Sequence, residues 1–171
     1  MNNILVTGGA GYIGSHIVQK LLKLKKKVFI IDNLSTGYKR LINKKAKFYN
    51  CDINNFKKVN KIIRDENINS VIHLAALLDV NESQKNPKKY YKNNVLGTDN
   101  VIKACIKSNV KNFIFSSTAA VYRDGIFKVK ESSQIKPKSI YGKCKFKAEK
   151  LIKQKLKKNK INYAILRYFN V

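Results

Sequence analysis

Short runs of apolar residues alternate along the chain with longer stretches in which apolar residues recur every three or four positions. The short runs, such as NILVTG and KNFIFSST, are rich in β-branched and aromatic residues and predict buried strands. The longer stretches predict amphipathic helices, and Ser139 stands where a helix cap is expected. The expected strands are residues 3–8, 27–32, 46–53, 68–76, 111–118 and 162–170, and the expected helices are 14–27, 56–66, 86–109 and 139–159.

This alternation of strands and helices predicts an α/β fold with a doubly wound parallel sheet and helices on both faces. Strands that are apolar throughout suit a sheet that is buried on both sides. The 171 residues have the length of one domain, and no repeat or linker divides them. In the first helix the residues expected on the buried side are Ile17, Val18, Leu21, Leu22 and Leu24.

A glycine-rich segment, TGGAGYIGSH, follows the first expected strand and opens the first expected helix. Glycines at Gly8, Gly9, Gly11 and Gly14 allow a tight turn and let a pyrophosphate approach the main chain, while the start of the helix offers free N–H groups. Asp32 ends the second strand, where an acid accepts hydrogen bonds from ribose hydroxyls and repels a 2′-phosphate. This context predicts a Rossmann-type site for NAD rather than NADP.

Tyr141 and Lys145 lie four residues apart on the last expected helix and therefore share one face. A phenol with a pKa near 10 needs about 4 kcal/mol of stabilisation to ionise at pH 7. An ammonium ~4 Å away supplies about 1 kcal/mol in bulk water but about 4 kcal/mol at the effective dielectric constant of a protein cleft. Lys145 can therefore activate Tyr141 only in a partly desolvated cleft, where the solvated lysines beside it cannot act.

The net charge of +26 comes almost entirely from lysine, because the only arginines are Arg40, Arg64, Arg123 and Arg167. The lysines are spread along the whole chain together with abundant asparagine and isoleucine, which indicates a compositional bias rather than a binding face. We therefore expect no specific nucleic-acid partner, only salt-sensitive association with polyanions. A polyanion-binding module is kept as an alternative function.

Membrane, metal and disulfide chemistry are not indicated. No window of about 18 apolar residues occurs, and the first residues lack the charged segment of a secretion signal, so we expect no membrane partner and a cytoplasmic location. Cys51, Cys105 and Cys144 lack disulfide or metal-ligand spacing, which predicts reduced thiols, with Cys144 in the core, and no metal site. His16 and His73 have no acid or nucleophile beside them in a motif and are interpreted as packing or surface residues.

Eight segments in a fixed order show a resemblance to a known family: TGGAGYIGSH, DNLSTG, CDI, HLAA, YYKNNVLGT, FSSTAAVY, YGKCK and LRYFNV. Over residues 3–171 the chain resembles the extended short-chain dehydrogenases/reductases of the NAD-dependent epimerase/dehydratase type. Within that family, dehydratases place acidic residues around the serine or threonine of the fifth strand. This chain has Ala119 and Ala120 there, which favours a 4-epimerase of UDP-sugars.

The resemblance implies an isomerase of galactose metabolism that interconverts UDP-galactose and UDP-glucose through a 4-keto sugar, by reversible hydride transfer to bound NAD. It implies that Tyr141 takes the proton of the sugar 4-hydroxyl and that Lys145 lowers the tyrosine pKa and grips the nicotinamide ribose. It further implies that Thr118 hydrogen-bonds the sugar oxygen and that Asn170 contacts the substrate. The implied cofactor contacts are Gly8, Gly11, Tyr12, Ile13, Gly14, Asp32, Asn33, Leu34, Ser35, Thr36, Gly37, Asp52, Ile53, Leu74, Ala75, Ala76, Leu77, Leu78, Asn94, Ser116, Tyr141, Lys145 and Phe169.

Members of this family continue for roughly as many residues again, whereas this chain stops at Val171, shortly after the last expected strand. We therefore expect residues 1–171 to be the N-terminal cofactor half, without the substrate domain and inactive alone. A non-catalytic NAD-binding fragment and an epimerase of another nucleotide sugar are the alternatives. The resemblance also implies a homodimer formed through the helix behind Pro87 and the helix of Tyr141.

Two residues depart from the family pattern. Leu78 stands where many members have a lysine near the cofactor phosphates. Arg123 stands where the family usually has glycine, and a positive φ at that position would strain the backbone of an arginine.

Overall fold

Six parallel strands form one sheet at the centre of the computed structural model, which describes residues 3–125 and 128–169. The strand order is β3-β2-β1-β4-β5-β6, so β1 has β2 on one side and β4 on the other. The winding of the chain therefore reverses between β1 and β4, and crevices form at such a reversal in doubly wound sheets. The strands are β1 (Asn3–Thr7), β2 (Lys27–Asp32), β3 (Lys47–Asn50), β4 (Ser70–His73), β5 (Asn112–Thr118) and β6 (Asn162–Tyr168).

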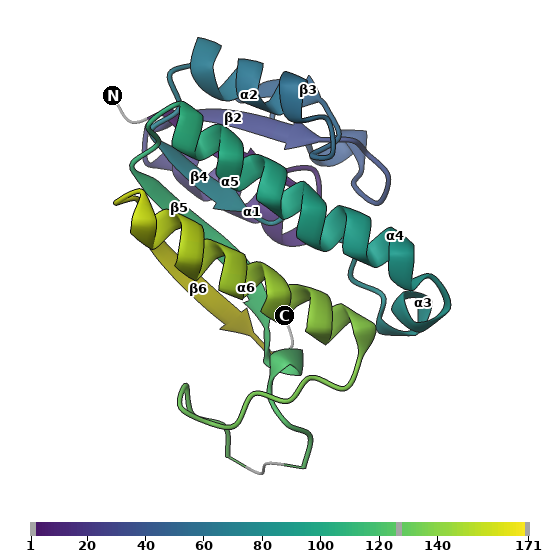
Figure 1. Ribbon diagram of the computed structural model, residues 1–171. Helices are drawn as coiled ribbons and strands as arrows, with labels where there is room; N and C mark the ends of the chain where they lie inside the picture. The colour runs from purple at the N-terminus through teal and green to yellow at the C-terminus, as the bar shows by residue number, and fades with distance from the viewer. Residues whose placement is uncertain (1–2, 126–127, 170–171) are drawn as a thin grey trace.

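Helices cover both faces of the sheet, with α2, α5 and α6 lying side by side on one face and α1 on the other (Figure 1). The helices are α1 (Tyr12–Lys23), α2 (Phe56–Asp65), α3 (Val80–Lys85), α4 (Pro87–Tyr91), α5 (Thr98–Lys107) and α6 (Ile140–Lys158). A π-helical stretch, η2 (Lys92–Gly97), joins α4 to α5, and η1 (Lys39–Leu41) and η3 (Ala119–Val121) are short 3₁₀ turns.

The larger hydrophobic core lies between the sheet and helices α2, α5 and α6, where Phe29, Phe113 and Ile152 are fully buried. A smaller core under α1 contains Val18 and Ile30. Burial of apolar surface on this scale is the main favourable contribution to folding. It holds α6, with its functional side chains, against strands β5 and β6.

The α/β architecture and all six strands expected from the hydrophobic pattern are confirmed. The long helix expected over residues 86–109 is formed by α4, η2 and α5 in succession. Ser139 caps α6 as expected, because its hydroxyl accepts a hydrogen bond from the backbone N–H of Gly142. Helix α3 was not expected, although Asp79 caps it by accepting from the N–H of Glu82.

One expectation from the sequence is wrong, and the condition attached to another is not met. Leu24 was expected on the buried side of the first helix but is 55% exposed, because α1 ends at Lys23 and Leu24 lies beyond its last turn. Arg123 does not have a positive φ, so the strain considered for it does not arise. Its backbone N–H instead donates to the carbonyl of Gln134 at 2.9 Å.

None of the helices in the described part of the chain is both long and apolar enough to cross a bilayer.

Candidate functional site

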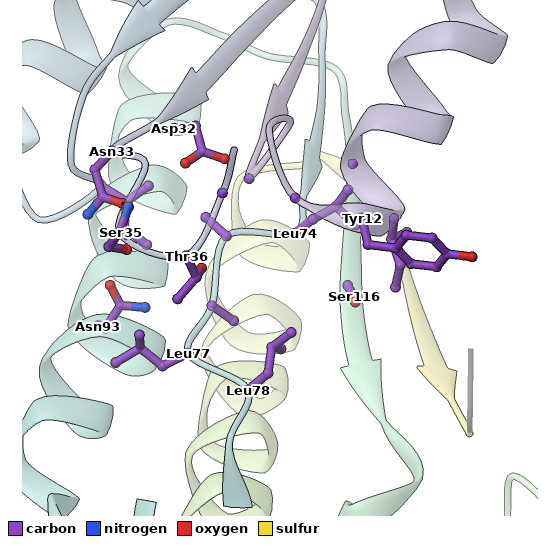
Figure 2. Close-up of a pocket in the computed structure, with 18 of the residues that line it drawn as sticks. Tyr12, Asp32, Asn33, Ser35, Thr36, Leu74, Leu77, Leu78, Asn93 and Ser116 are labelled. Atoms are coloured by element: carbon purple, nitrogen blue, oxygen red, sulfur yellow. Dashed lines mark hydrogen bonds between the residues drawn. The ribbon is translucent and has the colours of Figure 1, made fainter. Parts of the chain in front are cut away.

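A cavity of about 420 Å³ opens along the carboxyl ends of β1, β2, β4 and β5 (Figure 2). Asp32, Asn33 and Ser35 lie at one end of the view, the backbone from Leu74 to Leu78 runs through its middle, and Ser116 lies on the far strand. Because parallel strands all end at the same edge, residues distant in sequence meet here.

At two positions of the glycine loop, neighbouring backbone atoms leave no room for a side chain. Gly8 has a φ of +72°, and a Cβ there would lie 2.7 Å from the backbone nitrogen of Ala75. A Cβ on Gly14 would lie 2.1 Å from the carbonyl oxygen of Gly8. Both glycines are therefore required for the first turn of α1 to lie directly against the end of β1.

The first turn of α1 faces this cavity with its N–H groups free of side-chain caps. Gly11 occupies the cap position without a side-chain hydrogen bond, and no acidic residue lies in the first turn. The helix dipole and the free N–H groups together suit an anionic group such as a pyrophosphate. Tyr12 and Ile13 line the same end of the cavity, and the Tyr12 ring projects away from the loop (Figure 2).

Asp32 orders the opposite end of the cavity through two backbone contacts. Its carboxylate accepts hydrogen bonds from the N–H groups of Ala10, at 3.0 Å, and Leu34, at 2.8 Å. Since each carboxylate oxygen has two lone pairs, both retain acceptor capacity beyond these contacts. Asp32 can therefore hold the loop and also bind a hydroxyl group of a ligand.

At the third part of the site, the N-terminal turn of α6 brings Tyr141 over the end of β5. Tyr141 is 9% exposed, and burial raises the pKa of its phenol, whereas the Thr118 side chain acts in the opposite direction. The backbone N–H of Tyr141 donates to Ser83 Oγ at 3.1 Å, which ties the start of α6 to α3. Tyr141 and Thr118 both line the cavity.

Lys145 lies one turn behind Tyr141 and is buried, with 2% of its surface exposed. Its Nζ donates to the carbonyl oxygen of Ser116 at 2.7 Å and lies 4.8 Å from the centre of the Phe115 ring. Burial lowers the pKa of Lys145 to about 8, and the Glu149 carboxylate opposes this effect. Lys145 is thus a desolvated ammonium one helical turn from Tyr141, while the causes that shift the Tyr141 pKa are burial and Thr118 and do not include Lys145.

The model of the NAD dependent epimerase/dehydratase family matches residues 4–171. The chain belongs to this family.

Relatives within the family are similar over almost all of this chain. The UDP-glucose 4-epimerase of Lactobacillus helveticus is 46% identical, and the match covers 98% of this chain and 51% of the relative. The solved structure of the UDP-Glc/GlcNAc 4-epimerase of Campylobacter jejuni has a TM-score of 0.96 at 38% identity, covering 99% and 54% of the two chains. The UDP-glucose 4-epimerase of Brucella ovis, solved in complex with NAD, has a TM-score of 0.95 at 36% identity, covering 99% and 52%. The chain thus spans about half the length of the relatives it matches.

Most of the family residues expected from the sequence line the cavity. Leu34, Asp52, Asn94 and Lys145 do not belong to its lining, and Asn170 lies outside the described residues. The expected residues that line it are Gly8, Gly11, Tyr12, Ile13, Gly14, Asp32, Asn33, Ser35, Thr36, Gly37, Ile53, Leu74, Ala75, Ala76, Leu77, Leu78, Ser116, Thr118, Tyr141 and Phe169. The lining residues that were not expected are Ile31, Cys51, Asn93, Ser117 and Tyr168.

Apart from Lys145, the residues outside the lining contact or adjoin residues that belong to it. Asp52 accepts from the Asn33 side chain at 3.3 Å, and Leu34 adopts a positive φ of 59° in the turn after Asp32. Asn94 holds the backbone of Leu77 by both groups, accepting from its N–H and donating to its carbonyl, each at 2.9 Å. These residues shape the segments that line the cavity.

The π-helical stretch η2 explains why Asn93 and Asn94 both serve the site. One extra residue in a helical turn changes the direction of the side chains that follow it, and such insertions are frequent at functional sites. Asn93 lines the cavity, while the neighbouring Asn94 is buried and binds Leu77. The sequence showed only an uninterrupted helix here, so Asn93 was not identified.

A buried histidine connects β1, β4 and α5 beneath the same segment. Thr98 donates to the carbonyl of Asn94, so it accepts from His73 Nε2 at 2.9 Å, which leaves His73 Nδ1 to accept from the Thr7 hydroxyl at 2.7 Å. Thr7 Oγ1 in turn accepts from the N–H groups of Leu74 and Ala75. The interpretation of His73 as a packing residue is consistent with these contacts, which hold the floor of the cavity.

Residues 3–125 and 128–169 contain no group of three or more histidines, cysteines or acidic residues that could hold a metal ion. Cys51, Cys105 and Cys144 are free thiols and are buried, with Cys144 in a cluster beside Tyr141. The expectation that Cys144 belongs to the core is confirmed.

The buried His73 predicts a loss of stability in mild acid. Burial lowers its pKa from 6.5 to about 3, so between these values the unfolded chain binds a proton that the folded chain does not. The free energy of unfolding should therefore fall as the pH decreases below 6.5, by about 1.4 kcal/mol per pH unit from this residue. Urea unfolding at several pH values should show a smaller acid slope for His73→Gln than for the parent.

His16 provides the matched control because it is exposed on α1. His16→Gln should keep the acid slope of the parent chain. Equal slopes for the parent and His73→Gln would show that His73 becomes protonated without loss of the fold.

Proposed function

We propose that this chain binds NAD in the cavity and forms the cofactor half of a 4-epimerase that interconverts UDP-galactose and UDP-glucose. The observation that carries the proposal is the arrangement at the end of the cavity. There Tyr141 and Thr118 line the same end of the cavity, and the buried Lys145 lies one helical turn from Tyr141. A site of this kind can move a proton between a bound hydroxyl group and a tyrosine.

The side chains and backbone groups present are suited to NAD. Gly8 and Gly14 leave the main chain bare, and the uncapped start of α1 suits the pyrophosphate. Asp32 has acceptor capacity for the adenosine ribose and would repel the 2′-phosphate of NADP. The apolar residues from Leu74 to Leu78 would cover the middle of the cofactor, and Ile53 would lie against the adenine.

When bound, NAD supplies the acceptor and donor of hydride at C4 of the sugar. The task of Tyr141 is to take the proton of the 4-hydroxyl at its Oη and to return it after the sugar has turned. Burial raises the pKa of Tyr141, so the phenolate requires compensation. Thr118 supplies a hydrogen bond and Lys145 a positive charge. The lowering of the Tyr141 pKa by Lys145 stays a prediction for the cofactor-bound state.

The substrate class is proposed from the relatives. The Lactobacillus helveticus relative is named a UDP-glucose 4-epimerase, and the Campylobacter jejuni protein is named for both UDP-Glc and UDP-GlcNAc. Ala119 and Ala120 follow Thr118 in the chain, so no carboxylate from these positions is available to drive elimination of water. The part of the relatives that this chain does not match is proposed to bind the UDP-sugar.

Gly14→Ala should weaken NAD binding by about tenfold or more, because the added Cβ would displace the Gly8 carbonyl and open the phosphate loop. Isothermal titration of the 171-residue chain with NAD measures the effect. Circular dichroism of the same samples checks that the variant is folded.

Gly125→Ala is the matched control, because alanine at the Gly125 φ of +81° also strains the backbone, but this residue is absent from the cavity lining. Its NAD affinity should equal that of the parent. A folded Gly14→Ala chain with parental affinity would contradict the proposed cofactor site.

Tyr141→Phe should lower kcat roughly 10³-fold, because the proton acceptor is lost while the ring remains. The assay uses a chimaera in which this chain precedes the C-terminal half of the Lactobacillus helveticus relative, with UDP-galactose as substrate and UDP-glucose as the measured product. Tyr163→Phe, at the start of β6 and outside the cavity, should leave kcat unchanged.

Undiminished turnover by the Tyr141→Phe chimaera would reject Tyr141 as the base.

We also propose that two copies of the chain pair through the groove between α4, η2 and the start of α6. The proposal is supported by Tyr91 and Leu96, which are 38% and 46% exposed on adjoining helical turns, and by the neighbouring Ile140. Lysines border this apolar surface, and Lys147 Nζ lies 4.7 Å from the centre of the Tyr91 ring. An apolar centre with a polar rim is the usual anatomy of an interface.

Leu96→Asp should convert a dimer to monomers in sedimentation velocity, because a carboxylate at the apolar centre would be desolvated on pairing. Leu24→Asp is the matched control, since Leu24 is exposed at the end of α1 and outside the groove. A parent chain that sediments as a monomer at high concentration would reject this interface.

A further inference from the structure

A buried carboxylate lies one helical turn beyond Lys145. Tyr141, Lys145 and Glu149 succeed one another at intervals of four residues and therefore lie on one face of α6. Glu149 is fully buried, with 0% of its surface exposed. Glu149 is not part of the cavity lining. A buried carboxylate is costly unless it is paired, and such groups are often found close to functional sites.

The partners of Glu149 come from the two strands beneath α6. Arg167 of β6 donates from Nη2 to Glu149 Oε2 at 2.7 Å and from Nε to Oε1 at 3.0 Å, which is a bidentate ion pair. Ser117 of β5 donates to the same Oε1 at 2.5 Å. Arg167 also donates to the Tyr122 hydroxyl at 2.8 Å. The carboxylate is thus fixed in position by groups on β5 and β6.

Lys145 and Glu149 contact consecutive residues of the same strand. Lys145 donates to the Ser116 carbonyl, while Glu149 accepts from the Ser117 hydroxyl. The two charged groups are therefore held at adjacent points of β5 by separate hydrogen bonds. Both groups are buried, and the low effective dielectric constant there makes their electrostatic interaction stronger than it would be at the surface.

The other acidic groups and the histidine on the elements around Lys145 are paired or neutral, so they do not supply the negative charge that Glu149 supplies. From β4, His73 is neutral because burial lowers its pKa to about 3. From α5, Asp99 is already paired with Lys103 and Lys155, and the latter lies further along α6. From α3, Glu82 is paired with Lys89 and Tyr90. From β6, Arg167 reaches this region through Glu149 itself.

We propose that Glu149 is a positioning residue that keeps the buried Lys145 in its charged form, and that Arg167 limits the strength of this effect by pairing with Glu149. Its value for catalysis rests on the proposed function, in which Lys145 must be an ammonium to bind the nicotinamide ribose and to stabilise the Tyr141 phenolate. The proposal agrees with the two effects on the Lys145 pKa: burial lowers it, and the Glu149 carboxylate raises it.

An effect on charge can be separated from a loosening of the fold by its sign. In Glu149→Gln the opposite charge is lost and Arg167 is left as a nearby like charge, so the pKa of Lys145 should move to lower pH. In Arg167→Gln the carboxylate faces Lys145 without its partner, so the pKa should move to higher pH. Entry of water into a loosened structure would move both variants upward, toward the ordinary lysine value of 10.5.

The decisive experiment is an NMR titration of the 171-residue chain carrying ¹³C- and ¹⁵N-labelled lysine. The Lys145 signal is assigned by its loss in Lys145→Arg, and its midpoint is measured for the parent, Glu149→Gln and Arg167→Gln. Glu66→Gln, which removes a carboxylate paired with the surface Lys47, is the matched control and should leave the midpoint unchanged.

The proposal requires a downward shift of the Lys145 midpoint in Glu149→Gln, and an unchanged or raised midpoint would overturn it. If Glu149→Gln does not fold, the double variant Glu149→Gln with Arg167→Gln removes both buried charges, and its midpoint should lie below that of the parent. A double-variant midpoint at or above the parent value would also overturn the proposal.

A second readout links Lys145 to the cofactor. At a pH between the Lys145 midpoints of the two chains, Glu149→Gln should bind NAD about tenfold more weakly than the parent, and the difference should disappear at lower pH. If the parent binds no NAD at any pH, the proposed function fails, whereas the NMR titration still decides the role of Glu149.

Discussion

The parallel pairing of β1 with β2 on one side and β4 on the other is the constraint on which the site depends. It brings the glycine loop after β1, Asp32 at the end of β2 and the segment after His73 to one edge of the sheet. None of these groups is near the others in sequence. Gly8 can carry no side chain because the turn after β1 lies against the segment from β4, and Gly14 can carry none because the first turn of α1 lies against Gly8.

Buried polar groups then give this edge its particular shape. His73 links Thr7 to Thr98, and Asn94 holds the backbone of Leu77, so the apolar segment that crosses the cavity is supported from below by hydrogen bonds. Each of these groups is satisfied, which is the condition for polar side chains to be tolerated in a core. These hydrogen bonds fix the backbone that lines the proposed cofactor site.

The buried charged groups of α6 also need partners, because burying a charge costs more free energy than burying a neutral polar group. Lys145 is desolvated, and only a hydrogen bond to Ser116, an aromatic face and the nearby Glu149 compensate for that burial. The Glu149–Arg167 pair also joins α6 to β6, so the helix that carries Tyr141 is aligned with the strand that leads to Phe169. In a chain with so many solvated lysines, burial is what distinguishes this one.

The sequence by itself determined the elements, their order and the chemistry of the motifs, because hydrophobic periodicity, glycine and capping residues act within a few residues of one another. It therefore predicted the six strands, the phosphate loop and the Tyr141–Lys145 face. It could not show that Asn93 would line the cavity, since a π-helical insertion is a compromise between helix and tertiary packing. Nor could it reveal Glu149, Arg167 and Ser117 as one cluster, because only the pairing of β5 with β6 under α6 brings them together. Burial and the pairing of distant strands are decided by the whole fold, and they alone determine which of the many charged residues act in a low dielectric.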